Sequence, residues 1–418
     1  MAIIRSVASS IIAVAAMAQL ARAQERTVYE SEGAIKVVTG EACGRMAGEN
    51  RTFGSTFEFL IPPVKFSPQV RSGPNISLDP IVMDVPAYAD ESLVFLNGFK
   101  GTYESNDHHI GSLGASVGTL TPDYSVPSGV EIADKGTDDE VTGCFYYTGI
   151  AWSYAGMNAR VETNIEPVDD REQATVSSIE WSYPPVSGLR IALPLRYLMT
   201  TNRGDRHLIQ YAYNLTQDRV SPLRQRVRAE AIMKDNDRSS KINFYGDITM
   251  MVSITARFLE APFELEPRNG NCSFWSGCSQ FGRSTPYRQL RRLGANENEI
   301  IIPVLTGFDL DSSNDDDHIK HVGAWIDDFR FNPELRTFEW YENADFRDKG
   351  DSVFNHRLNV AQLRLTYTPV GPLADVRVPG GIEIPTQENE ADSPETSDGS
   401  AILAPIPGDL DVPGEIQE

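Results

Sequence analysis

The sequence predicts an all-β protein of three tandem β-sandwich-like domains, related by an internal D-x-H hairpin repeat and followed by a disordered acidic C-terminal tail. Two observations favour this class. The segment from Leu305 to Ile326 has two similar copies earlier in the chain, and runs rich in β-branched and aromatic residues alternate with Pro, Gly, Asn and Asp clusters. Long amphipathic helical patterns are nearly absent, and residues 286–299 are the best candidate for one short helix.

Each copy of the repeat contains Asp-x-His followed by Ile or Leu, with an aromatic residue ten positions before the histidine. The pairs are Asp107 and His109, Asp205 and His207, and Asp316 and His318, and the aromatics are Phe99, Tyr197 and Phe308. The aligned histidines are 98 and 111 residues apart, which are β-sandwich domain lengths and too long for a solenoid repeat. We therefore predict domains at residues 24–167, 168–262 and 263–370.

In each copy, a turn rich in Asn, Asp and Gly joins two strands, which predicts a hairpin. Apolar residues follow the histidine at four, six and eight positions, so a period of two places them on the histidine's face of the strand. These residues are Leu113, Ala115 and Val117, then Tyr211, Tyr213 and Leu215, then Val322, Ala324 and Ile326. The Ile or Leu directly after the histidine is out of phase, which predicts a β-bulge.

The aspartate and histidine of each D-x-H pair are predicted to share one face near the rim of the sandwich. There they can bond each other or the turn amides and hold the strand register. We expect a structural clasp, because a catalytic pair would rarely be needed once in every domain.

The third copy is rich in hard oxygen ligands of the kind that calcium requires. The candidate ligands are Asp309, Asp311, Asn314 and Asp315. Their spacing does not match the EF-hand loop, and an acidic solvated turn is the other interpretation. Zinc is disfavoured, because His318 and His321 would point to opposite faces of a strand. We therefore expect no cofactor, with calcium as the alternative.

The start of the chain indicates export. Residues 1–23 combine Arg5, an apolar run and an Ala-Arg-Ala end, which is typical of a signal peptide. Four cysteines in an exported chain predict two disulfides, and proximity favours Cys43–Cys144 and Cys272–Cys278. Four cysteines allow three pairings, and buried thiols are the other alternative.

Charge limits the partners. The net charge is −22, and residues 371–418 hold eleven Asp and Glu against one Arg, which predicts a disordered acidic tail. An acidic chain repels nucleic acid and anionic lipid, and no segment predicts membrane insertion.

The stretch CSFWSGC would present Phe274 and Trp275 on a disulfide-closed loop. Such a loop is a platform for binding sugar or protein, and the other interpretation is that Trp275 only fills the edge of the domain.

Together these features predict an exported, non-catalytic multidomain β-protein. It would bind protein or carbohydrate at a surface, as an adhesin or a lectin does, or act in extracellular or periplasmic assembly. A secreted hydrolase with an Asp–His site is the alternative. It has little support from motifs, since neither G-x-S-x-G nor H-E-x-x-H occurs.

Overall fold

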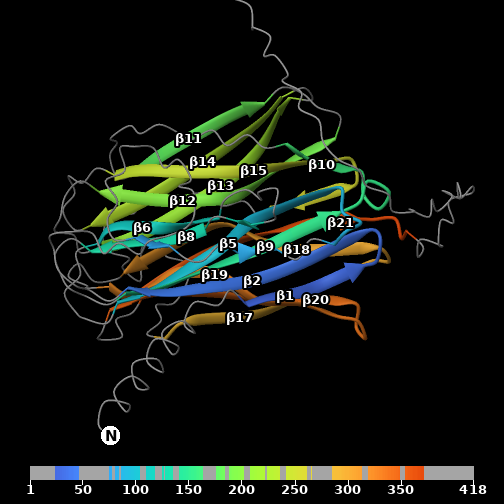
Figure 1. Cartoon of the computed structure of the whole chain (residues 1–418). Coiled ribbons are helices and arrows are strands. Elements are labelled where there is room, and N and C mark those ends of the chain that lie inside the picture. The colour runs from blue at the N-terminus through green and yellow to red at the C-terminus, as the bar shows by residue number, and fades with distance from the viewer. Residues whose placement is uncertain are drawn as a thin grey trace, which may run out of the picture. The chain divides into compact units, whose positions relative to one another are not determined.

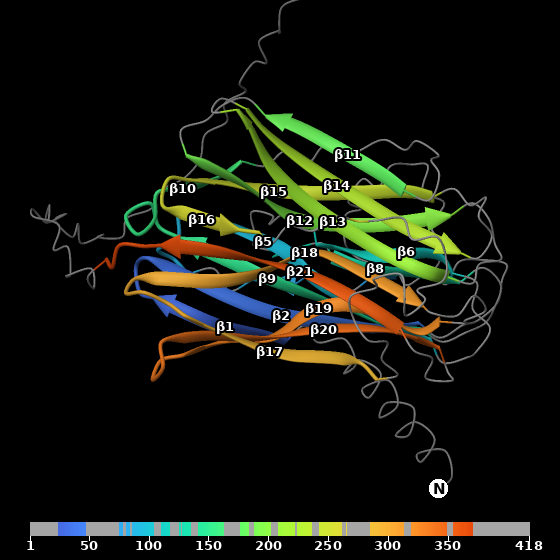
Figure 2. The same cartoon turned by 180° about the vertical axis from the view of Figure 1, so that it is seen from behind.

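The computed structural model describes residues 24–46, 75–77, 81–83, 86–103, 110–117, 125–126, 128–134, 141–162, 176–183, 188–201, 208–221, 224–235, 242–260, 265, 285–312, 319–348 and 354–370. Within these residues the protein is all-β, with antiparallel strands β1 to β21 (Figures 1 and 2). The described residues contain no helix with the length and apolarity needed to cross a bilayer. The predicted signal peptide and the predicted tail lie outside the described residues.

The strands form three large sheets and one small one. Sheet A contains, in spatial order, β1 (Gln24–Ser31), β2 (Ile35–Met46), β9 (Val141–Trp152), β5 (Glu91–Tyr103), β19 (Ile319–Asn332), β20 (Thr337–Asp348) and β17 (Tyr287–Gly294). Sheet B contains β10 (Ala159–Glu162), β15 (Ile242–Ser253), β12 (Leu189–Thr201), β6 (Ile110–Val117), β8 (Ser128–Asp134) and β3 (Asn75–Ser77). Sheet D contains β11 (Val176–Tyr183), β14 (Arg224–Asp235), β13 (Leu208–Ser221), β18 (Glu299–Ser312), β21 (Phe354–Thr366) and β16 (Ala256–Leu259). The small sheet C pairs β4 (Ile81–Val82) with β7 (Ser125–Val126).

The strands on either side of the three D-x-H turns pair between segments. Strands β5, β12 and β18 precede the turns, and they pair with β19, β6 and β13 respectively. The three ladders have the same register, because each aromatic of the sequence pattern faces the residue six positions after a histidine. The facing pairs are Phe99 with Ala324, Tyr197 with Ala115, and Phe308 with Tyr213. The centre of the protein therefore has a threefold strand order.

The predicted hairpins are wrong. The two strands that flank a D-x-H turn lie in different sheets: β5 and β6 in A and B, β12 and β13 in B and D, and β18 and β19 in D and A. Both neighbours of each strand are other strands, so none pairs with the strand across its own turn. A period of two identifies a strand and its buried face, but it does not identify the partner strand.

The three tandem sandwiches are not confirmed. The predicted boundaries fall between β10 and β11 and between β16 and β17, yet every large sheet contains strands from two of the predicted domains. All described strands belong to one compact unit that ends at Ala374. The D-x-H repeat is not confirmed either, since its aspartates and histidines lie outside the described residues.

The predicted bulge after the histidine is present in all three segments. The register shifts between Ile110 and Ser112, between Leu208 and Gln210, and between Ile319 and His321. The residues predicted to face the core at four, six and eight positions after the histidine are all buried. The period-two pattern therefore gave the correct inner face.

The three aromatics of the pattern meet in the core. Ring centroids of Phe99 and Tyr197 are 5.7 Å apart, those of Tyr197 and Phe308 are 5.5 Å apart, and those of Phe99 and Phe308 are 6.4 Å apart. Glycines one position along the ladders, opposite Leu198 and Lys100, let two of the backbone pairs approach closely. A Cβ on Gly114 would lie 2.1 Å from the carbonyl oxygen of Tyr197, and one on Gly323 would lie 2.3 Å from that of Phe99. Glycine is thus required at both positions.

A second bulge precedes each aromatic by two residues, at Asn97, Leu195 and Thr306. The Asn97 side chain is buried and bonds three strands together. Its Nδ2 donates to Thr148 Oγ1 at 2.7 Å and to the carbonyl oxygen of Pro303 at 3.1 Å. Its Oδ1 accepts from the backbone N–H of Leu305 at 3.1 Å. Sheet A and sheet D are joined at this side chain.

The N-terminal strand β2 completes the threefold order. Strand β10 follows β9 and pairs with β15, and β16 follows β15 and pairs with β21 (Figure 2). The corresponding place beside β9 is occupied by β2. The predicted Cys43–Cys144 disulfide is confirmed, and it joins facing residues of this β2–β9 ladder. A bridge across 101 residues of chain stabilises the fold by about 4–5 kcal/mol in the loop-entropy description.

We predict that Asn97→Ala lowers the free energy of unfolding by about 2–4 kcal/mol, because the Leu305 N–H and the Pro303 carbonyl lose a buried partner. Urea unfolding followed by tryptophan fluorescence measures this change. Asn158→Ala, at an exposed position, is the control and should leave stability nearly unchanged. Equal stability of the Asn97 variant and the wild type would show that Asn97 does not join the sheets.

Candidate functional site

Most of the candidate functional residues predicted from the sequence lie outside the described residues, so their roles remain predictions. They are Asp107, His109, Asp205, His207, Cys272, Phe274, Trp275, Cys278, Asn314, Asp315, Asp316 and His318. The described members of the predicted sites are Asp309 and Asp311 of the calcium set and the Cys43–Cys144 pair.

Asp309 and Asp311 are buried in the central strand β18. Asp309 Oδ1 accepts from Gln210 Nε2 at 2.9 Å, and Arg357 faces Asp309 across the ladder. Both carboxylates thus lie among strand side chains rather than in an acidic turn. Within the described part of the chain, no group of three or more His, Cys, Asp or Glu is arranged to hold a metal ion.

The outer face of sheet A has an aromatic row. Trp325 lies between the core residues Ala324 and Ile326, so the strand alternation directs it to the opposite face. There its ring stacks on Tyr146, with centroids 5.8 Å apart and 15° between the planes. Lys100 Nζ lies 5.3 Å from the Trp325 ring centroid. The stacked rings of Trp325 and Tyr146 are only 6% and 7% exposed, so they are buried at the base of this face.

Asp327 lies beside this aromatic row. Its Oδ2 accepts from Arg288 Nη1 at 2.9 Å and from Trp325 Nε1 at 3.2 Å. Its Oδ1 is buried and has no hydrogen-bond partner among the described residues. The guanidinium of Arg288 also lies 3.9 Å from the ring centroid of Tyr341. A carboxylate oxygen, an aromatic ring and a guanidinium are therefore adjacent at this position.

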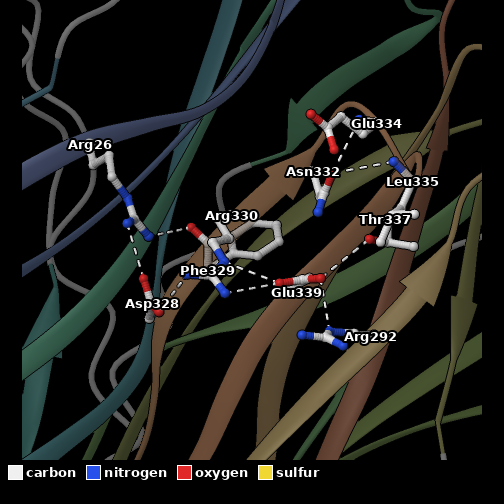
Figure 3. Close-up of polar contacts among 10 residues, drawn as sticks. All are labelled: Arg26, Arg292, Asp328, Phe329, Arg330, Asn332, Glu334, Leu335, Thr337 and Glu339. Carbon is white, nitrogen blue, oxygen red and sulfur yellow. Dashed lines mark hydrogen bonds and ion pairs between the residues drawn. The ribbon is translucent and has the colours of Figure 1, made fainter.

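A network of arginines and carboxylates joins the strands next to the stacked rings of Trp325 and Tyr146 (Figure 3). The buried Glu339 accepts from Arg330 Nε and Nη2, at 3.2 and 3.0 Å, and forms an ion pair with Arg292 Nε at 2.9 Å. Arg26 donates to Asp328 Oδ1 at 3.1 Å and to the carbonyl oxygen of Phe329 at 2.7 Å. Strands β1, β19, β20 and β17 are thus linked through side chains.

Strand β17 carries three arginines on an edge of sheet A, where β20 is its only described neighbour. The side chains of Arg288, Arg291 and Arg292 are 49%, 47% and 58% exposed. Arg291 and Arg292 are held by carboxylates of β20, with Arg291 Nε donating to Glu342 Oε2 at 3.0 Å, and Arg288 is held by Asp327 of β19, the next strand of the sheet. Arg291 and Arg292 each bond their carboxylate through Nε.

Burial shifts the pKa of several side chains. Burial, and then Glu41, raises the pKa of the Tyr146 hydroxyl well above its usual value, so Tyr146 stays protonated in the aromatic row. Burial lowers the pKa of His321, which lies 3.3 Å from Thr102 Oγ1 on the same face of sheet A. Burial also raises the pKa of Glu260, next to β16, to about 7.

The sequence reasoning missed the arginine edge. Residues 286–299 were expected to form a short helix, because Tyr287, Leu290 and Leu293 recur every three residues. That expectation is wrong: Tyr287–Gly294 is strand β17, paired along its whole length with β20. Pairing with a distant strand overrides the local pattern. Trp325 could have been found, since it stands out of phase with the predicted core residues.

The fold and this face define an all-β protein with a rigid arginine-rich sheet edge. No known protein family matches the chain, and neither a curated protein nor a solved structure matches it.

We predict that Glu339→Gln lowers the free energy of unfolding by about 1–3 kcal/mol, because two guanidinium groups lose a buried anion while remaining partly solvated. Thermal and urea unfolding at low and high salt measure the change. Glu297→Gln, at an exposed position, is the matched control. The account of the network would be wrong if both variants unfolded like the wild type.

Proposed function

We propose that this chain is an exported, non-catalytic binding protein that holds its partner at the β17 edge and the adjoining outer face of sheet A. The observation that carries the proposal is the row of Arg288, Arg291 and Arg292, each half-exposed and each fixed by a carboxylate. A guanidinium fixed in this way loses little conformational entropy on binding, so it is prepared to receive an anion.

The chemistry of the edge favours an anionic partner. Guanidinium groups form paired, charge-assisted hydrogen bonds with carboxylate and sulfate groups. The chain carries a net charge of −22, whereas at this edge each of the three arginines offsets a carboxylate. The edge therefore repels an anion less than the rest of the acidic surface does.

A lectin-like role is the second candidate. A sugar ring can stack its apolar face on an aromatic side chain, and the predicted loop with Phe274 and Trp275 offers two such side chains. Carbohydrate is therefore the second class of partner.

Export and the remaining predicted roles belong to the same proposal. The Cys43–Cys144 disulfide is compatible with an oxidising compartment outside the cytosol. We retain the D-x-H pairs as structural clasps, the loop with Phe274 and Trp275 as a second contact, and calcium as an alternative ligand of the third turn. A secreted hydrolase with an Asp–His site remains the alternative function.

Binding to polyanions tests the proposal. We expect the wild-type chain to bind immobilised poly-glutamate or dextran sulfate at physiological salt, and Arg291→Gln/Arg292→Gln to bind about tenfold more weakly. Biolayer interferometry measures both. Arg160→Gln/Arg257→Gln removes the same charge from exposed positions on sheets B and D and should bind like the wild type. Equal weakening in both double variants would show that only the net charge of the protein matters and would contradict a site at the β17 edge. Absence of binding to either polymer would refute the proposal.

A further inference from the structure

We infer that the partner is an acidic, extended polypeptide segment that adds to sheet A as a strand beside β17. This inference rests on the proposed function and narrows it to one class of ligand. It is carried by two properties of β17 that coincide: a backbone edge without a described partner, and arginines on both faces of the strand.

The backbone of β17 offers a strand-pairing edge. The strand has eight residues, and its ladder to β20 runs from Tyr287 opposite Ala344 to Gly294 opposite Thr337. In an antiparallel ladder, alternate residues direct their N–H and C=O groups away from the partner. About half of the β17 backbone groups therefore point to the free edge, where a peptide strand can satisfy them. A polysaccharide has no matching row of alternating donors and acceptors.

The side chains define what the added strand must carry. Arg288, Leu290 and Arg292 share one face of β17, because they stand opposite the outer-face residues Asn343, Tyr341 and Glu339 of β20. Arg291 lies on the other face. Cross-strand pairs of opposite charge stabilise a sheet. The partner therefore needs carboxylates opposite the three arginines and an apolar side chain opposite Leu290.

Self-association is disfavoured in one symmetric register. In an antiparallel pairing of two β17 strands centred on Leu290, Arg288 of each copy would face Arg292 of the other. Like charges directly opposite each other destabilise a sheet. An acidic strand avoids this repulsion and is therefore the occupant that the arginines favour.

The probe is an octapeptide, Thr-Val-Glu-Glu-Val-Thr-Glu-Val, which places its glutamates opposite Arg292, Arg291 and Arg288 when it pairs antiparallel. Two derivatives carry N-methyl groups, one at the odd positions and the other at the even positions. A strand partner uses only one of these two sets of N–H groups. Binding to the full chain is measured by fluorescence anisotropy, and the peptide with glutamine in place of glutamate is the charge control.

We expect the unmethylated peptide to bind, one N-methyl derivative to lose at least about tenfold in affinity, and the other to stay within about threefold. Arg291→Gln/Arg292→Gln should weaken the peptide about tenfold, and Arg160→Gln/Arg257→Gln should not. Equal binding of both N-methyl derivatives would overturn strand addition while leaving an anion-binding edge. Binding of dextran sulfate without any peptide binding would overturn the inference in favour of an anionic glycan. Failure of poly-glutamate and dextran sulfate alike would refute the proposed function itself.

Discussion

Three short ladders at the centre of the protein hold the rest of the structure in place. Each joins the strand before one turn to the strand after another, with five facing residue pairs in an identical register. The aromatics Phe99, Tyr197 and Phe308 lie at equivalent positions, one pair from the end of each ladder, and contact one another. Each large sheet contains strands from two of the three successive parts of the chain, so no part forms its sheets alone. The three parts therefore share one core.

The inner faces were predictable from sequence, and the partners were not. The alternation around Leu113, Tyr211 and Val322 correctly gave the buried residues, and the out-of-phase Ile or Leu correctly gave a bulge. A hairpin and a connection between two sheets show the same local pattern, which is a turn between two strands of alternating residues. The sequence therefore could not predict that the chain passes from one sheet to another at each turn. The Cys43–Cys144 bridge was predictable from export and proximity. The β17 edge was not, because its three-residue apolar spacing imitates a helix and only the ladder to β20 makes it a strand.

The candidate binding edge depends on this architecture. Sheet A ends on one side at β1, next to β2, which the disulfide fixes to β9, and on the other side at β17. Glu339 and Glu342 are nearly buried, so they hold Arg292 and Arg291 from within the sheet. In the proposed function, ion pairs of this kind hold the arginines in place for an anionic partner. The three arginines and their carboxylates all belong to the third segment, and the shared sheet brings Arg26, Lys100 and Tyr146 of the first segment close to them.

Differential scanning calorimetry of the full chain tests the shared core most directly. One cooperative unit predicts a single transition, with a van't Hoff enthalpy about equal to the calorimetric enthalpy. Independent tandem sandwiches predict two or three transitions, or one broad transition whose van't Hoff enthalpy is roughly a third of the calorimetric value. A single transition with equal enthalpies would support the claim that the three segments share sheets and unfold together. Separate transitions would contradict it.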